Sequence, residues 1–126
     1  IKELADPLIR KGVVQWFGSY QPHELPRRMA GVDWVVVPSV WWENSPMVIQ
    51  EAFVCGRPLL VSDIGGMAEK VQHGVNGFHV PVGSVQAWAQ TMLKVVGDVD
   101  AWARCREGIM PPIVHSGCAD AVIENL

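Results

Sequence analysis

The pattern of apolar and polar positions predicts that strands and helices alternate along this chain. Short apolar runs bounded by Gly or Pro indicate buried strands, and amphipathic runs behind a capping residue indicate helices. The predicted strands span 13–17, 34–37, 58–61 and 77–80, and the predicted helices span 22–30, 46–55, 67–73 and 85–96. This order predicts an α/β fold, a Rossmann-like parallel sheet with helices on both faces. We expect four parallel strands that bury Val14, Val36 and Leu60.

The predicted helix 46–55 is apolar almost all round, which is typical of a buried helix. We expect Ser45 to be its N-cap, Pro46 its first residue and Gly56 its left-handed stop. Its only polar side chains are those of Gln50 and Glu51. A carboxylate on a buried helix needs a protein donor, water in a cleft, or the hydroxyl groups of a ligand.

A second carboxylate, Glu43, precedes Glu51 with seven residues between them. Glu43 falls in the loop before the helix, so the pair spans on the order of 10 Å at the rise of a helix, which is the reach of a nucleotide. Both acids follow the strand 34–37, and parallel sheets bind ligands at the carboxyl ends of their strands. The residues alone leave an alternative open, in which Glu51 faces solvent and Glu43 is an ordinary loop acid.

The next strand ends at a glycine pair, Gly65 and Gly66. Paired glycines let a backbone approach a ligand closely, and the following helix would offer its first amide groups to an anion. A tight turn between strand and helix explains these glycines equally well.

Length and composition limit the class of protein to which this chain can belong. Its 126 residues are enough for one domain with a hydrophobic core. The net charge is −3 and only Arg27 and Arg28 are adjacent basic residues, so a nucleic-acid partner is not expected. We see no apolar run near the roughly 20 residues of a membrane span and no leader-like start. The three cysteines have no Cys-x-x-Cys spacing, which favours reduced thiols and a cytoplasmic location; they are Cys55, Cys105 and Cys118.

Six tryptophans are many large rings for a domain of this size to bury, so we expect some of them to be exposed. Together with the start at Ile1, they suggest a fragment of a larger protein.

Several motifs occur in the order of a known family. They are Pro38-Ser39, Glu43-Asn44-Ser45-Pro46, Glu51-Ala52, Gly56-Arg57-Pro58, Val61-Ser62, Gly65-Gly66 and Asn76-Gly77. The region from about residue 12 to residue 96 resembles the carboxy-terminal, donor-binding domain of the group 1 retaining glycosyltransferases of GT-B fold. Residues 97–126 are then expected to form a helical tail.

The resemblance implies a nucleotide-diphosphate sugar as donor substrate, with no cofactor and no metal. It implies that Glu51 binds the ribose and that Glu43, the catalytic candidate, contacts the donor sugar near the reacting carbon. The other implied binding residues are Asn44, Ser45, Pro46, Met47 and Val48 at the diphosphate and sugar, Ser19 and Tyr20 near the base, and the pair Gly65 and Gly66. The family's amino-terminal, acceptor-binding domain is not in this sequence, so we expect the isolated fragment to be inactive.

Two other functions remain open: a non-catalytic α/β interaction or regulatory module, and a fragment of a GT-B sugar-nucleotide epimerase. The run Asp98-Val99-Asp100 imitates a metal-binding motif, but its place between two helices favours a helix cap. The histidines lack the spacing of zinc ligands; they are His23, His73, His79 and His115. No Gly-x-Ser-x-Gly elbow of an α/β hydrolase is present.

Overall fold

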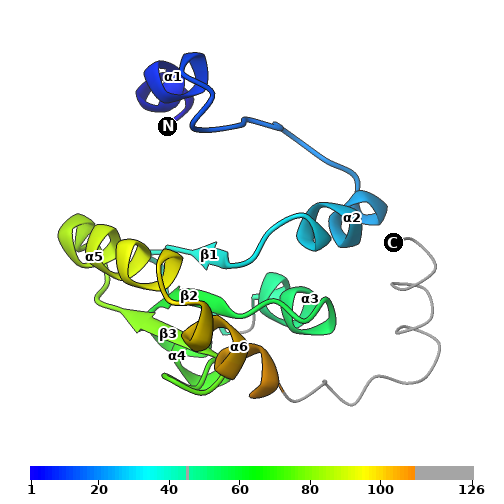
Figure 1. Ribbon diagram of the computed structural model, residues 1–126, viewed down its shortest axis with the longest axis vertical. Helices are drawn as coiled ribbons and strands as arrows, with labels where there is room; N and C mark the ends of the chain where they lie inside the picture. The colour runs from blue at the N-terminus through cyan, green and yellow to red at the C-terminus, as the bar shows by residue number, and fades with distance from the viewer. Residues whose placement is uncertain (45, 110–126) are drawn as a thin grey trace.

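A computed structural model describes residues 1–44 and 46–109 of the chain. Its elements are α1 (Lys2–Arg10), a 3-10 turn η1 (Pro22–Glu24), α2 (Leu25–Ala30), β1 (Val35–Val37), α3 (Met47–Val54), β2 (Leu59–Ser62), α4 (Gly65–Lys70), β3 (Gly77–Val80), α5 (Val85–Val96) and α6 (Val99–Glu107). The strands form one parallel sheet in the order β1-β2-β3, shown in Figure 1. The predicted Rossmann-like α/β fold is confirmed.

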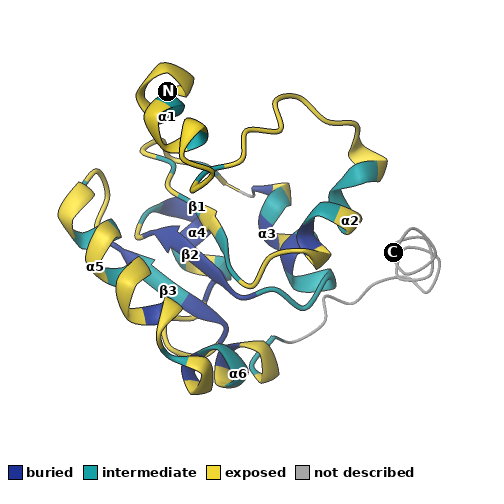
Figure 2. Ribbon diagram, turned by 45° about the horizontal axis from the view of Figure 1, so that its top comes forward, coloured by how far each residue is buried: buried dark blue, intermediate teal, exposed yellow. Residues whose placement is uncertain are grey.

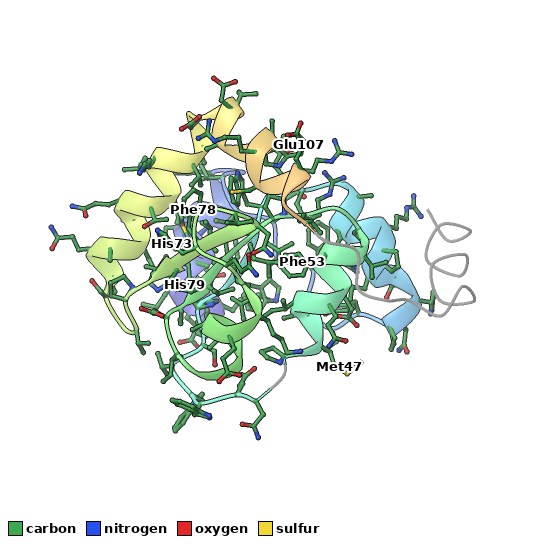
Figure 3. The ribbon with its side chains drawn as sticks, turned by 90° about the horizontal axis from the view of Figure 1, so that it is seen from below. Met47, Phe53, His73, Phe78, His79 and Glu107 are labelled. Carbon is green, nitrogen blue, oxygen red and sulfur yellow. The ribbon has the colours of Figure 1, made fainter. Side chains whose placement is uncertain are left out.

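Helices cover both faces of this sheet. Alternate strand residues point to opposite faces, and Leu59 and Val61 pack on one face with Ile49 of α3 and Met67 of α4. The other face carries the register row Val36, Leu60 and Phe78, on the side where Figure 3 shows α5 and α6. The central strand β2 is fully buried, dark blue in Figure 2, because it has a partner on each edge and helices on each face.

Local capping signals set the starts of α5 and α6 and the end of α3. The side chain of Ser84 accepts a hydrogen bond from the Ala87 N–H and that of Asp98 from the Ala101 N–H, so α5 and α6 begin as predicted. Gly56 adopts the left-handed conformation (φ +67°) just after α3. Pro46 was predicted as the first helical residue, but it is extended (φ −63°, ψ 119°), occupies the N-cap position, and α3 begins at Met47.

Some predicted boundaries are wrong. The helix predicted at 67–73 is α4, which begins at Gly65 and ends at Lys70, because the glycine pair itself enters the first turn. The predicted N-cap Ser45 and the carboxy-terminal part of the predicted tail, which includes His115, Cys118 and a helix expected from about Ala119, lie outside the described residues.

The strand predicted at 13–17 is not formed, and the described residues contain three strands rather than four. This segment belongs to an amino-terminal arm, defined here as residues 1–21, that Figure 1 draws apart from the sheet. Most of its apolar side chains remain exposed, with Val13 at 72% and Phe17 at 67%. A strand needs a neighbour for its N–H and C=O groups, and none pairs with this segment among the described residues.

Three residues were predicted to be buried. The prediction is confirmed for Leu60, which is 1% exposed, and is wrong for Val36 and Val14. Val36 is 37% exposed because β1 is an edge strand, and Val14 is half-buried in the arm. The expected exposed tryptophans are present: Trp16, Trp41 and Trp42 are 48%, 75% and 70% exposed.

Candidate functional site

The candidate site is built on the loop that leaves the carboxyl end of β1 and enters α3. This loop crosses the start of α4, which follows the neighbouring strand β2, and the Gly66 N–H donates a hydrogen bond to the Glu43 carbonyl oxygen at 2.6 Å. The structure therefore places Glu43 where the carboxyl ends of two adjacent parallel strands meet. This is the edge of an open α/β sheet where ligands bind.

The carboxylate of Glu43 is held by one neighbour in its own loop. The Ser39 hydroxyl lies 3.0 Å from Glu43 Oε1 and donates to it, and the same hydroxyl oxygen receives the Trp41 N–H at 3.4 Å. Glu43 is half-buried. Ser39 was quoted as part of a motif, but its contact with Glu43 was not predicted.

Glu51 lies in the middle of α3, whose buried side chains are those of Ile49 and Ala52. It is half-buried, and its carboxylate makes no hydrogen bond or ion pair within residues 1–44 and 46–109. Burial is the main cause that raises the pKa of the Cys55 thiol; the Arg57 charge opposes this shift and the Glu51 carboxylate adds to it. A half-buried carboxylate without a protein partner is free to accept hydrogen bonds from a polar ligand.

The start of α3 leaves backbone donors free. The Ile49 N–H binds the Pro46 carbonyl, whereas the N–H groups of Met47 and Val48 have no acceptor among the described residues. Met47 is also exposed in its side chain, at 72%, and Figure 3 shows it at the rim of the molecule. These donors and the helix dipole favour a negative group at this end.

The glycine pair at the start of α4 is buried against protein backbone. A Cβ on Gly66 would overlap the carbonyl of Asn44, and one on Gly65 would come within 3.0 Å of the Glu43 carbonyl oxygen. Gly65 also has a φ of +56°, which side chains disfavour. The observed neighbour of both glycines is therefore the Glu43 loop.

A pair of side chains at the same edge was not predicted. Asp63 follows β2, and its Oδ1 lies 3.4 Å from Nδ1 of His79 on β3, while His79 Nε2 is hydrogen-bonded to the Val71 carbonyl. His73 accepts the His79 N–H at 3.0 Å, and Figure 3 shows the two imidazole rings together. The only sequence signal was the position of Asp63 two residues after a predicted strand.

The segment expected near the base lies in the exposed arm. Tyr20 is 49% exposed, and the Arg28 guanidinium lies 5.5 Å from its ring centroid. No hydrogen bond joins Ser19 or Tyr20 to the Glu43 loop within the described part of the chain.

The described residues contain no group of three or more His, Cys, Asp or Glu side chains arranged to hold a metal ion, and Asp98 caps α6 as predicted. Cys55 and Cys105 are free thiols, and burial raises the pKa of both. Among the helices of residues 1–44 and 46–109, none is long and apolar enough to cross a membrane.

Comparison with known proteins identifies the family of this chain. Residues 1–98 match the family of glycosyl transferases group 1. The chain belongs to the group 1 glycosyltransferases. It is 31% identical over 109 residues to a D-inositol 3-phosphate glycosyltransferase of Jonesia denitrificans, covering 84% of this chain and 26% of the relative. It is also 31% identical over 84 residues to sucrose synthase 2 of Pisum sativum, covering 67% of this chain and 10% of that protein.

Solved structures of other proteins share the fold. The chain superimposes on Alr3699/HepE of Anabaena, crystallised with UDP-glucose, with a TM-score of 0.73, 29% identity, and coverage of 98% of this chain and 34% of that one. For the sucrose-phosphate synthase of Thermosynechococcus elongatus the TM-score is 0.75, the identity 25%, and the coverages 98% and 32%. This glycosyltransferase chain therefore spans about a third of the solved structures and about a quarter of the first curated relative.

Proposed function

We propose that this chain is the donor-binding domain of a retaining glycosyltransferase and that it binds a nucleotide-diphosphate sugar. The observation that carries the proposal is the placement of two half-buried carboxylates, Glu43 in the loop after β1 and Glu51 on the helix that follows. In this function an acceptor-binding domain elsewhere in the complete enzyme supplies the second half of the active site. Free thiols at Cys55 and Cys105 are in keeping with work in the cytoplasm.

The ribose and the diphosphate of the donor each have a matching group on α3. Glu51 binds the ribose diol, because a carboxylate that accepts two hydroxyl hydrogen bonds makes a charge-assisted and oriented contact. The N–H groups of Met47 and Val48, with the backbone from Asn44 onward, bind the diphosphate at the positive end of α3. Ser19 and Tyr20 approach the base.

Glu43 acts on the sugar. Glycosyl transfer passes through a sugar with oxocarbenium-like positive charge while negative charge grows on the leaving diphosphate. A carboxylate beside the sugar stabilises the first charge, and the amide donors at the start of α3 stabilise the second. In this proposal Glu43 contributes electrostatically and does not form a bond to the sugar.

The binding half of the proposal is tested on the chain itself. UDP and UDP-glucose are titrated in a calorimeter, with GDP and ADP as alternative nucleotides, because relatives were crystallised with UDP and UDP-glucose. Glu51→Ala should weaken nucleotide binding by about 1.5 to 3 kcal/mol, or roughly 10- to 150-fold in Kd. Glu107→Ala is the matched control, since Figure 3 shows Glu107 on α6 at the far side from Met47. Equal affinity of all three proteins, or no binding of any nucleotide, contradicts the proposal.

The chemical half needs the complete enzyme with its acceptor domain. Glu43→Gln keeps the size of the side chain and removes its charge, so it should lower kcat far more than it weakens nucleotide binding. NMR of the product gives the anomeric configuration, and retention of the donor configuration is expected. Inversion would exclude the retaining mechanism, and an unchanged kcat would remove Glu43 from the chemistry.

A second candidate, a non-catalytic interaction module, is favoured by one observation: Trp41 and Trp42 expose 75% and 70% of their surface on the Glu43 loop. The nucleotide titration separates the two functions. A donor domain should show nucleotide-dependent changes in tryptophan fluorescence that Trp41→Phe and Trp42→Phe remove, whereas an interaction module should show none.

A further inference from the structure

The loop that carries Glu43 is tied at two points to groups that the proposed chemistry does not use. The first is the Ser39 hydroxyl, 3.0 Å from Glu43 Oε1. The second is the Gly66 N–H, which binds the Glu43 carbonyl oxygen at 2.6 Å from the first turn of α4. One contact holds the side chain and the other holds the backbone of the same residue.

The direction of the Ser39 contact is fixed because a carboxylate has no proton to donate. A serine hydroxyl has one proton, and its oxygen already accepts the Trp41 N–H. The proton is therefore free to point at Glu43, whose ionised carboxylate can only accept. A hydrogen bond to a charged group is stronger than one between neutral groups and restricts the carboxylate to one orientation.

The backbone contact depends on glycine. The Asn44 carbonyl occupies the space that a Cβ at Gly66 would take, so only glycine lets the loop lie this close to α4. The contact joins the segment after β1 to the segment after β2, the strand that pairs with β1. The glycine pair thereby fixes the position of the Glu43 backbone relative to α4.

We propose that Ser39 and Gly66 are positioning residues for Glu43: Ser39 orients its carboxylate and Gly66 sets the position of its backbone. This inference rests on the proposed function of Glu43 and explains the glycine pair by a contact with protein rather than by a contact with phosphate. A group that must meet a charge developing in the transition state acts best when it is held in place beforehand, because no reorganisation is then needed during the reaction.

The Ser39 contact is tested in the complete enzyme with Ser39→Ala and Ser39→Thr. Loss of the hydroxyl should lower kcat about tenfold or more while the Kd of UDP changes by less than about threefold, and threonine, which keeps the hydroxyl, should restore most of kcat. Ser84→Ala is the matched control, since it removes a hydroxyl hydrogen bond at the start of α5 and should leave kcat unchanged. An unchanged kcat in Ser39→Ala refutes the role, as does a parallel loss of kcat and UDP affinity that threonine does not restore.

The Gly66 contact is tested on this chain without any activity. Its amide should exchange with deuterium far more slowly than the amide of Gly83, which lies in an exposed turn and has no acceptor among the described residues. In the complete enzyme, Gly66→Ala should lower kcat more than UDP affinity.

Rapid exchange at Gly66 refutes the contact even if Gly66→Ala fails to fold. If the complete wild-type enzyme neither binds nucleotide nor transfers sugar, the proposed function fails, and amide exchange still reports separately whether the loop is tied to α4.

Discussion

The sheet with its helices and the amino-terminal arm contain similar apolar sequences but differ in what those sequences achieve. Leu59, Leu60 and Val61 of β2 are at most 1% exposed, whereas Leu4 of α1 and Val13 of the arm are 85% and 72% exposed. Figure 2 shows the contrast as a dark blue β2 and a mostly yellow arm. Helix α1 has no buried residue although its apolar side chains follow a helical spacing.

An apolar pattern shows which side chains a segment could bury. Whether those side chains are buried depends on a neighbouring segment that pairs with or covers them. β2 has strands on both sides, so its backbone groups are paired and its side chains are enclosed. The segment 13–17 has the same pattern and no paired neighbour among the described residues, so it stays extended without forming a strand.

The largest difference between the sheet and the arm is expected when the same Leu→Ala substitution is made in each. Leu60→Ala should lower the free energy of unfolding by about 2 to 5 kcal/mol, because it leaves a cavity between the sheet and its helices. Leu4→Ala should change it by less than about 0.5 kcal/mol, because that side chain is exposed in the arm. Urea denaturation followed by circular dichroism measures both. Equal effects would mean that the arm is as well packed as the sheet.

A smaller effect is expected from adding one methyl group at a glycine. In Gly77→Ala the new Cβ would overlap the Leu59 carbonyl and lie 2.7 Å from Val71 Cγ1, so unfolding should become easier by about 1 to 3 kcal/mol. Gly12 in the arm has nothing within 4 Å, and although its φ is +72°, the unpacked arm can adjust to an alanine. Gly12→Ala should therefore leave the urea midpoint nearly unchanged, and a shift as large as that of Gly77→Ala would contradict the comparison.

The next largest loss of stability is expected when one helix cap is removed. Ser84→Ala removes the acceptor of the Ala87 N–H at the start of α5 and should cost about 1 kcal/mol of stability. Ser19→Ala removes the same hydroxyl in the arm, where no described hydrogen bond uses it, and should cost nothing measurable. Thermal denaturation of the two variants beside the wild type distinguishes these outcomes.

The smallest effect concerns Glu24, at the point where the arm meets α2. The Gln21 N–H, which lies 2.6 Å from Glu24 Oε2, is the main cause that lowers the pKa of Glu24, and the Arg28 charge adds to it. Because the folded pKa is lowered, this stabilising contact is present above the pKa of an unfolded glutamate and is lost as pH falls through the folded value.

An NMR titration of the Glu24 side chain should therefore have its midpoint below that of a glutamate in an unfolded peptide. Gln21→Pro removes the N–H at a φ of −84°, close to what proline imposes, and should move the midpoint upward. If the midpoint does not move, the Arg28 charge rather than the Gln21 N–H is the main cause of the lowered pKa of Glu24.

Prediction from sequence succeeded where the signal and its partner are close in the chain. The helix 85–96 and the strand 77–80 were predicted with their observed bounds, and the caps Ser84 and Asp98 bind amides three residues away. The order of elements also placed Glu43 and Glu51 after the same strand. The contacts of Glu43 with Gly66, and of Asp63 with His79, join different units of the fold, and no spacing rule in the sequence gives them.

The sequence by itself determined the alternation of strands and helices after residue 34, the caps of α5 and α6, and the spacing of the two carboxylates, because each depends on hydrogen bonds or side-chain directions within a few residues. The tertiary structure decided which apolar segments became strands, why Val36 is exposed at an edge, and that the glycine pair lies under the Glu43 loop. These features depend on backbone groups from distant segments meeting in space, and a strand or a close backbone contact exists only when its partner is present.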